Sequence, residues 1–219
     1  MTIITLPDEL GLGNSTSIEI FDYHSSQEIS KQQIILHKNT FSFLIEGSKE
    51  VQFDNSAISI DNTEFLLMKS GHCLMTEKLS EIRQYQSILL FFSNDLLIKF
   101  IRKNELNFSK KIENKSVYSF KYDAFIQSFV KSLVNISTLS KSVQNKMYEV
   151  KFEEIMLYLT EKHGTDFLLS LTINSTNAAQ NFTQTIESNK LNKLTLKELA
   201  FLCNMSLSTF KRVFEKHYS

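Results

Sequence analysis

The chain has 219 residues, of which 42% are hydrophobic and 22% are charged, a composition typical of an ordinary globular protein. Its 24 basic and 24 acidic residues give a formal net charge of zero, which argues against a protein coated in positive charge. One proline and five glycines exclude a long Gly/Ser-rich or Pro-rich linker. The charge is uneven, because residues 190–219 carry six basic and two acidic side chains. This asymmetry indicates a nucleic-acid-binding end joined to another domain.

Residues 1–92 predict a β domain. Phe41, Phe43 and Ile45 alternate with polar residues, which is typical of a strand with one buried face. Gly47 begins a turn, and Asp/Asn pairs separate the later strands. Further short strands are expected at 51–53, 57–60, 65–68, 73–76 and 82–92. Strands at this spacing favour a small closed or sandwich-like β structure.

Residues 93–172 predict a helical region for packing or dimerisation. Ser93 or Asn94 can cap a helix over 95–102, and apolar residues recur at helical spacing over 122–136. The longest helix is expected over 143–163, and Gly164 is a natural stop. Residues 173–189 are polar and predict a linker helix, with disorder as the alternative.

Residues 190–219 predict two short helices joined by a tight turn, a helix-turn-helix. Thr195 and Glu198 form a capping box, Asn204-Met205 makes the turn, and Ser206 caps the second helix. Apolar residues anchor that helix: Phe210, Val213 and Phe214. Its outward positions are then Leu207, Ser208, Lys211, Arg212 and Glu215. The alternative is a plain helical hairpin whose basic residues only keep it soluble.

The stretch LTLKELAFLCNMSLSTFKRVFEKHY resembles the first helix-turn-helix of AraC/XylS-type transcription regulators. The resemblance implies an α+β fold, with an N-terminal cupin-like β-barrel, a helical segment and a C-terminal helix-turn-helix. It also implies that Ser208, Lys211 and Arg212 read bases and that Lys216 contacts phosphates. The family pattern contains a second helix-turn-helix, which does not occur before Ser219. We therefore expect a truncation within the DNA-binding domain, or else a short regulator acting through its sensing domain.

The barrel is expected to sense a ligand or a partner protein. Its large apolar residues would line an apolar interior, or simply form a packed core: Phe41, Phe43, Ile45, Phe53, Phe65 and Tyr85. A long apolar molecule with an anionic end is one ligand class that such an interior favours. The counter-charge would come from a basic residue: Lys31, Lys38 or Arg83. The ligand-site candidates are thus Phe41, Phe43, Tyr85 and Arg83.

Catalysis, cofactors and metals are not indicated. His24, His37 and His72 are isolated, so no His-x-His cluster could hold a metal, and no nucleophile–base order or phosphate-binding loop is visible. Cys73 and Cys203 cannot make a disulfide framework or a zinc site on their own. No signal peptide or membrane span is visible, so we expect a cytoplasmic protein.

These observations predict a DNA-binding transcription regulator with an N-terminal sensing domain. The alternative is a small-molecule or protein-binding module without DNA-binding activity, and a cupin-type enzyme is the third reading. Helix 143–163 is suited to homodimerisation or to docking on the barrel, because its single apolar stripe serves either purpose.

Overall fold

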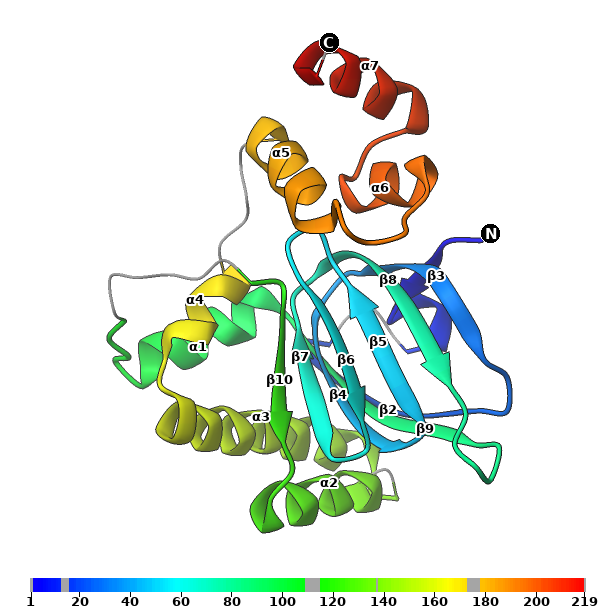
Figure 1. Ribbon diagram of the computed structural model, residues 1–219. Helices are drawn as coiled ribbons and strands as arrows, with labels where there is room; N and C mark the ends of the chain where they lie inside the picture. Colours follow the sequence, from blue (N-terminus) through cyan, green and yellow to red (C-terminus); the bar gives the residue numbers. More distant parts are fainter. Residues whose placement is uncertain (1, 13–15, 109–114, 137, 173–177, 219) are drawn as a thin grey trace.

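The protein, described by a computed structural model over residues 2–12, 16–108, 115–136, 138–172 and 178–218, has the expected α+β fold (Figure 1). Strands of the described residues form two five-stranded sheets. Sheet A has the order β1 (Ile4–Leu6), β3 (Ile29–Leu36), β8 (Gly71–Lys78), β5 (Ser48–Gln52) and β6 (Ala57–Asp61). Sheet B has the order β10 (Val117–Lys121), β7 (Glu64–Met68), β4 (Asn39–Glu46), β9 (Tyr85–Phe92) and β2 (Ile18–Ser25). Neighbouring strands are antiparallel except β1 and β3, which are parallel.

The two sheets face each other but do not close into a barrel. Among the described residues, no backbone ladder joins a strand of sheet A to a strand of sheet B. The expectation of a cupin-like barrel is therefore corrected to an open, cupin-like pair of packed sheets. Alternating apolar and polar residues predict a half-buried strand in either architecture, so the alternation could not decide between them.

One strand lies in the region expected to be helical. β10 lengthens sheet B at its edge by pairing with β7, and Val117 lies opposite Met68. Its five residues are too short for periodicity to separate a strand from a helix. The conformation is decided by a partner strand that lies far earlier in the chain.

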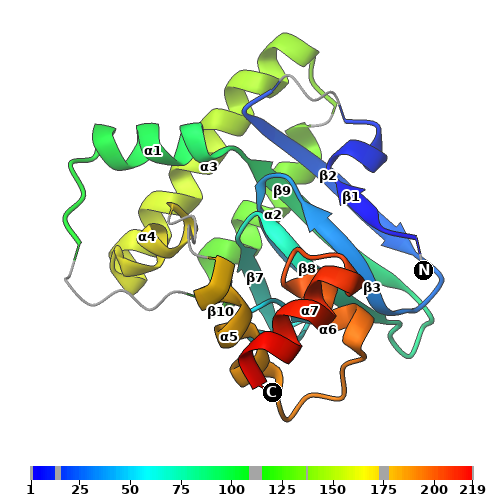
Figure 2. The same ribbon diagram turned by 90° about the horizontal axis from the view of Figure 1, so that it is seen from above.

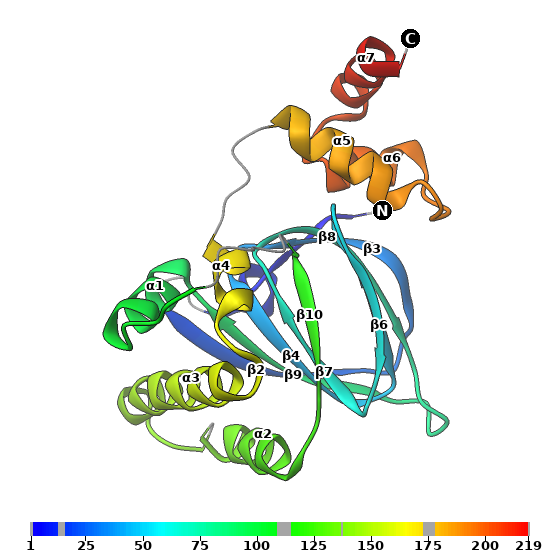
Figure 3. The same cartoon turned by 60° about the vertical axis from the view of Figure 1, so that its left-hand side comes forward.

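The helices of the middle region cover the outer face of sheet B (Figure 3). They are α1 (Asn94–Lys103), α2 (Ala124–Ile136), α3 (Lys141–His163) and the short α4 (Asp166–Thr172). The first three lie where the sequence predicts helices, and α4 was not predicted separately. Ser93 caps α1, as expected, because its side chain accepts a hydrogen bond from the Leu96 N–H at 3.2 Å. Gly164 follows α3 with a positive φ of 76°.

An aromatic core joins sheet B to these helices. The ring of Phe43 lies 5.1 Å from Phe65 on the neighbouring strand and 5.7 Å from Phe129 of α2. Phe92 of β9 lies 5.0 Å from Phe152 of α3. Each buried phenylalanine contributes about 1.5–3 kcal/mol relative to an exposed one, so this face holds sheet and helices together as one body.

The C-terminal helical unit comprises α5 (Ala178–Asn189), α6 (Leu196–Leu202) and α7 (Leu207–Tyr218). Part of the expected linker helix, residues 173–177, lies outside the described residues. The unit packs around Phe182, Ala200 and Phe210, and the two phenylalanine rings lie 5.4 Å apart. It lies at the end of the sheets away from α2 and α3 (Figure 1). Figure 2, which looks down on the unit, shows α7 as its outermost helix.

Candidate sensing cavity and candidate nucleic-acid interface

A cavity of about 190 Å³ lies between the two sheets. Both sheets contribute to its mainly apolar wall, including Leu6, Ile34, Leu36, Met75, Leu89 and Phe91. Its polar wall consists of a few side chains: Glu9, Tyr23, Thr40, Lys49 and Glu77. A concave, mostly apolar space with a few convergent polar groups is the general character of a small-ligand site.

A buried ion pair crosses the wall of this cavity. The Lys49 ammonium lies 3.1 Å from the Glu77 carboxylate, and the two side chains are only 2% and 5% exposed. Lys49 also donates a hydrogen bond to the Ser42 hydroxyl at 3.2 Å. Burial by itself lowers the pKa of Lys49, but Tyr85 and the Glu77 carboxylate together raise it above its ordinary value. Lys49 is therefore a charged group inside an apolar space.

Two tyrosines stand beside this pair. The Tyr85 ring is edge-on to Tyr23, with ring centres 5.8 Å apart, and the Lys49 nitrogen lies 5.8 Å from the Tyr85 ring centre. Burial raises the pKa of Tyr85 to about 12. Burial and then the charge of Glu77 raise the pKa of Tyr23. Both hydroxyls are therefore protonated at neutral pH and able to donate a hydrogen bond.

Gly47 permits the close approach of strands beside Tyr85. Its φ is 93°, and a Cβ atom there would lie 2.5 Å from the Lys78 carbonyl oxygen and 2.9 Å from the Tyr85 ring. Any larger residue would have to displace backbone as well as the ring. The turn expected at Gly47 is thus present, and it leads into β5, which pairs with β8 and carries Lys49 beside Tyr85.

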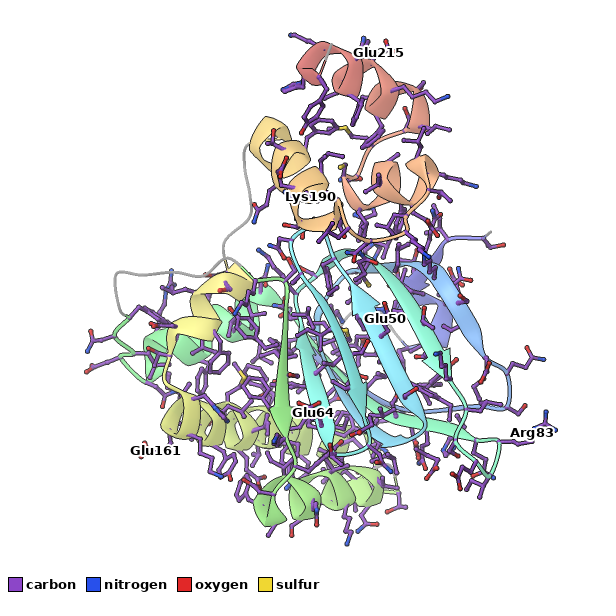
Figure 4. All side chains as sticks on the ribbon, viewed as in Figure 1. Glu50, Glu64, Arg83, Glu161, Lys190 and Glu215 are labelled. Atoms are coloured by element: carbon purple, nitrogen blue, oxygen red, sulfur yellow. The ribbon has the colours of Figure 1, made fainter. Side chains whose placement is uncertain are left out.

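The structure does not bring the four ligand-site candidates together. Phe41 and Phe43 point from sheet B toward the helices and belong to the core there, so the expectation that they line the interior is corrected. Tyr85 packs between the sheets, beside Lys49. Arg83 lies at the exposed turn between β8 and β9, away from the cavity (Figure 4). Alternation identified the strands but not the face, because both faces of sheet B are buried.

The other two counter-charge candidates also lie outside the cavity wall. Lys38 pairs with Glu19 at 3.0 Å, and Lys31 donates to the Lys193 carbonyl oxygen. Lys49 and Glu77 were missed in their place. One signal was available: Lys49 shares the alternation phase of the apolar Val51, which places a charge on an inward face.

The α6–α7 pair has the local geometry that the sequence predicts. The Thr195 hydroxyl accepts from the Glu198 N–H at 3.2 Å, and the Glu198 carboxylate accepts from the Thr195 N–H at 2.6 Å. The turn contains Asn204 with a φ of 53°, a conformation that asparagine tolerates well. Ser206 then caps α7 by accepting from the Thr209 N–H at 3.1 Å.

Helix α7 has a buried side and a basic side. Phe210 is fully buried inside the helical unit, whereas Phe214 is partly exposed at 38%. The four predicted DNA-contacting residues are exposed on α7: Ser208, Lys211, Arg212 and Lys216. The structure thus places them on one accessible helix, and their contact with DNA remains a prediction.

No cluster of three or more His, Cys, Asp or Glu side chains suited to a metal ion occurs in the part of the chain that the structure describes. None of the described helices combines the length and apolar character needed to cross a bilayer.

Comparison with known proteins identifies the middle of the chain. The model of a family described as the ExsA N-terminal regulatory domain matches residues 39–171, more than half of the sequence. The chain belongs to this family. The matched span runs from β4 to α4 and includes Lys49, Glu77 and the aromatic core. The protein therefore contains the regulatory domain of an AraC-type transcription regulator, as the resemblance implies. No curated protein matches the chain.

A solved structure shows the same fold over most of this ExsA-type chain. A lysine-to-alanine variant of apo ToxT from Vibrio cholerae is 12% identical, with 93% of this chain and 76% of ToxT covered and a TM-score of 0.53. An unsaturated-fatty-acid-bound ToxT from Vibrio cholerae is 12% identical, with 93% and 75% covered and a TM-score of 0.49. The AraC-like transcriptional activator CuxR is 12% identical, with 91% and 68% covered and a TM-score of 0.42. The first likeness extends the shared fold beyond residues 39–171.

Proposed function

We propose that this protein is a DNA-binding transcription regulator, in which α6 and α7 form a helix-turn-helix and the two-sheet domain receives a signal. The observation that carries the proposal is the exposed basic side of α7. This helix is the outermost of the helical unit, and its opposite side packs on the unit through the buried Phe210. A recognition helix must present side chains to the major groove while its opposite side packs on the unit. Arg212 could then bond a guanine edge in two places, and Lys216 is suited to a phosphate.

The deciding experiment measures binding of the protein to DNA from upstream of its own gene. Arg212→Ala should weaken binding to the specific site by about 1–3 kcal/mol, because a bidentate base contact is lost. The matched control is Arg102→Ala, since Arg102 is an exposed arginine on α1. Unchanged affinity of Arg212→Ala at low and moderate salt would refute the assignment of α7. Absence of any specific site would favour the alternative, a ligand- or protein-binding module that does not bind DNA.

The signal that we propose is a small, mainly apolar molecule carrying one acidic group, bound in the cavity between the sheets. The apolar wall would hold its body, and Lys49 with the neutral Tyr23 hydroxyl would meet its acidic end. Short aliphatic carboxylic acids should then raise the melting temperature of the wild type and leave the double variant Lys49→Met/Glu77→Leu unaffected. Equal shifts in both proteins would show that the acids bind elsewhere, and no shift would favour a partner protein as the signal.

The second copy of the chain is a further proposed partner. On α3, Val143, Val150 and Leu157 are 44%, 58% and 47% exposed, and their spacing of seven residues places them on one side of the helix. Such a stripe fits pairing with the same stripe of another copy. Val150→Glu should convert a dimer into a monomer in sedimentation experiments, whereas Ile82→Glu, at a 67% exposed turn, should not. A wild type that stays monomeric at high concentration would rule out this pairing.

A further inference from the structure

The C-terminal helical unit rests on the outer face of sheet A through a small apolar contact. Phe201 and Leu202 of α6 pack on Leu74 of β8, and the three residues are buried. The His72 ring meets the Phe201 ring edge-on, with centres 4.9 Å apart. Few apolar groups hold the unit here, so polar contacts have a larger share in fixing its position.

Asn189, the last residue of α5, makes two hydrogen bonds to the β domain, and Lys31 of β3 makes a further one to the Lys193 carbonyl oxygen. The Asn189 side-chain oxygen accepts from the Gln52 amide of β5 and, at 3.1 Å, from the Asn192 amide. Its amide nitrogen donates to the backbone carbonyls of Asp54 at 3.1 Å and of Thr185 at 2.8 Å. Every hydrogen-bonding position of this side chain is thus used, and Asn189 is only 4% exposed. Two of the four bonds cross from α5 to the β domain.

The strands under this contact also form a wall of the cavity. In the β5–β8 ladder, Gln52 lies opposite Leu74, and both side chains meet the helical unit. Three positions along β5 from Gln52, Lys49 lies opposite Glu77, and both line the cavity. Successive side chains of a strand point to opposite faces. The β5–β8 pair therefore presents the Lys49–Glu77 ion pair toward the cavity, and on its outer face it presents Gln52 and Leu74, the contact surface of the helical unit that we call the seat.

We propose that Asn189 is the positioning residue that fixes the helical unit on sheet A, and that the β5–β8 pair couples this seat to the cavity. A shift of Lys49 or Glu77 moves the backbone that carries Gln52 and Leu74, because packed strands do not deform independently. The coupling gives the proposed regulator a route from signal to α7, and in that sense it rests on the proposed function. The seat itself does not depend on DNA or ligand.

The test measures the position of the unit directly. Spin labels on Glu161→Cys and Glu215→Cys, two exposed positions on α3 and α7 (Figure 4), report the distance between the two regions by pulsed electron resonance once Cys203 is changed to Ser. The wild type should give one narrow distribution. Asn189→Ala should raise the ratio of displaced to seated molecules roughly fivefold or more, the effect of losing one or two hydrogen bonds. Gln184→Ala, which removes an exposed amide of α5, should leave the distribution unchanged.

Two further variants separate positioning from damage to α5. Gln52→Ala removes the same contact from the β5 side without touching the helix, so it should displace the unit as well. The double variant Gln52→Ala/Asn189→Ala should be no worse than Asn189→Ala alone, because both changes act on one shared bond. A narrow distribution in Asn189→Ala and Gln52→Ala, or fully additive effects, would overturn the role of Asn189.

A variant in the cavity wall tests the coupling between the cavity and the helical unit. Lys49→Met/Glu77→Leu replaces the ion pair by apolar side chains and should change the displaced fraction although no residue of the seat is altered. A distribution identical to that of the wild type would overturn the coupling. These measurements contain no DNA, so loss of the proposed DNA-binding function and loss of this inference are seen in different experiments.

Discussion

The outer faces of the two sheets are covered in different ways. Sheet B carries a continuous core in which aromatic rings of its strands, such as Phe43 and Phe92, interlock with α2 and α3. Sheet A is covered at its end by α6, through a cluster of three buried residues and the hydrogen bonds of Asn189. The helices on sheet B are therefore part of the domain's core, whereas the helical unit on sheet A is a separable body resting on it.

This difference suits the proposed function. In the proposed regulator, sheet B and its helices would be the rigid part that holds the signal, and the helical unit would be the movable part that reads DNA, because weakly packed contacts open first. The matched family span, residues 39–171, contains the whole aromatic core on sheet B and ends before the helical unit. The boundary found by comparison thus coincides with the change from extensive to sparse packing.

The largest loss of stability is expected when the aromatic core on sheet B is damaged. Phe43→Ala should lower the free energy of unfolding of the β domain by about 3–5 kcal/mol, because a fully buried ring leaves a cavity among other rings. Chemical denaturation followed by circular dichroism measures the loss. Phe125→Ala serves as the control, since Phe125 is 38% exposed on α2 and should cost much less. Equal losses in the two variants would contradict a continuous core on this face.

Damage to the contact between the helical unit and sheet A should have a smaller effect on the stability of the β domain. Phe201→Ala removes the largest apolar group of the seat, so the helical unit should become sensitive to proteolysis between α5 and α6 while the β domain unfolds within about 1 kcal/mol of the wild type. Limited proteolysis and denaturation of the same sample check both parts. A concerted loss of both parts would show that the two bodies are one cooperative unit.

Where the sequence predicted local structure, the evidence lay within a few residues. The Thr195–Glu198 capping box and the Ser93 cap have the predicted geometry, because donor and acceptor lie three residues apart and need no tertiary partner. The alternation around Phe43 also correctly predicted a strand, β4. Alternation could not identify the partner of each face. Phe41 and Phe43 were expected to line an apolar interior or to form a packed core, and they form the core between sheet B and the helices.

The sequence by itself determined the basic helix at residues 207–218, the caps that define it, and the AraC-type character of the chain, since all of these depend on short-range order. Tertiary structure decided that β10 completes sheet B, that the sheets remain open, and that Lys49 meets Glu77 inside an apolar cavity. It also decided that Asn189 meets Gln52, a residue 137 positions earlier. Such contacts depend on which strands become neighbours, and that is settled by the packing of the whole chain rather than by any local pattern.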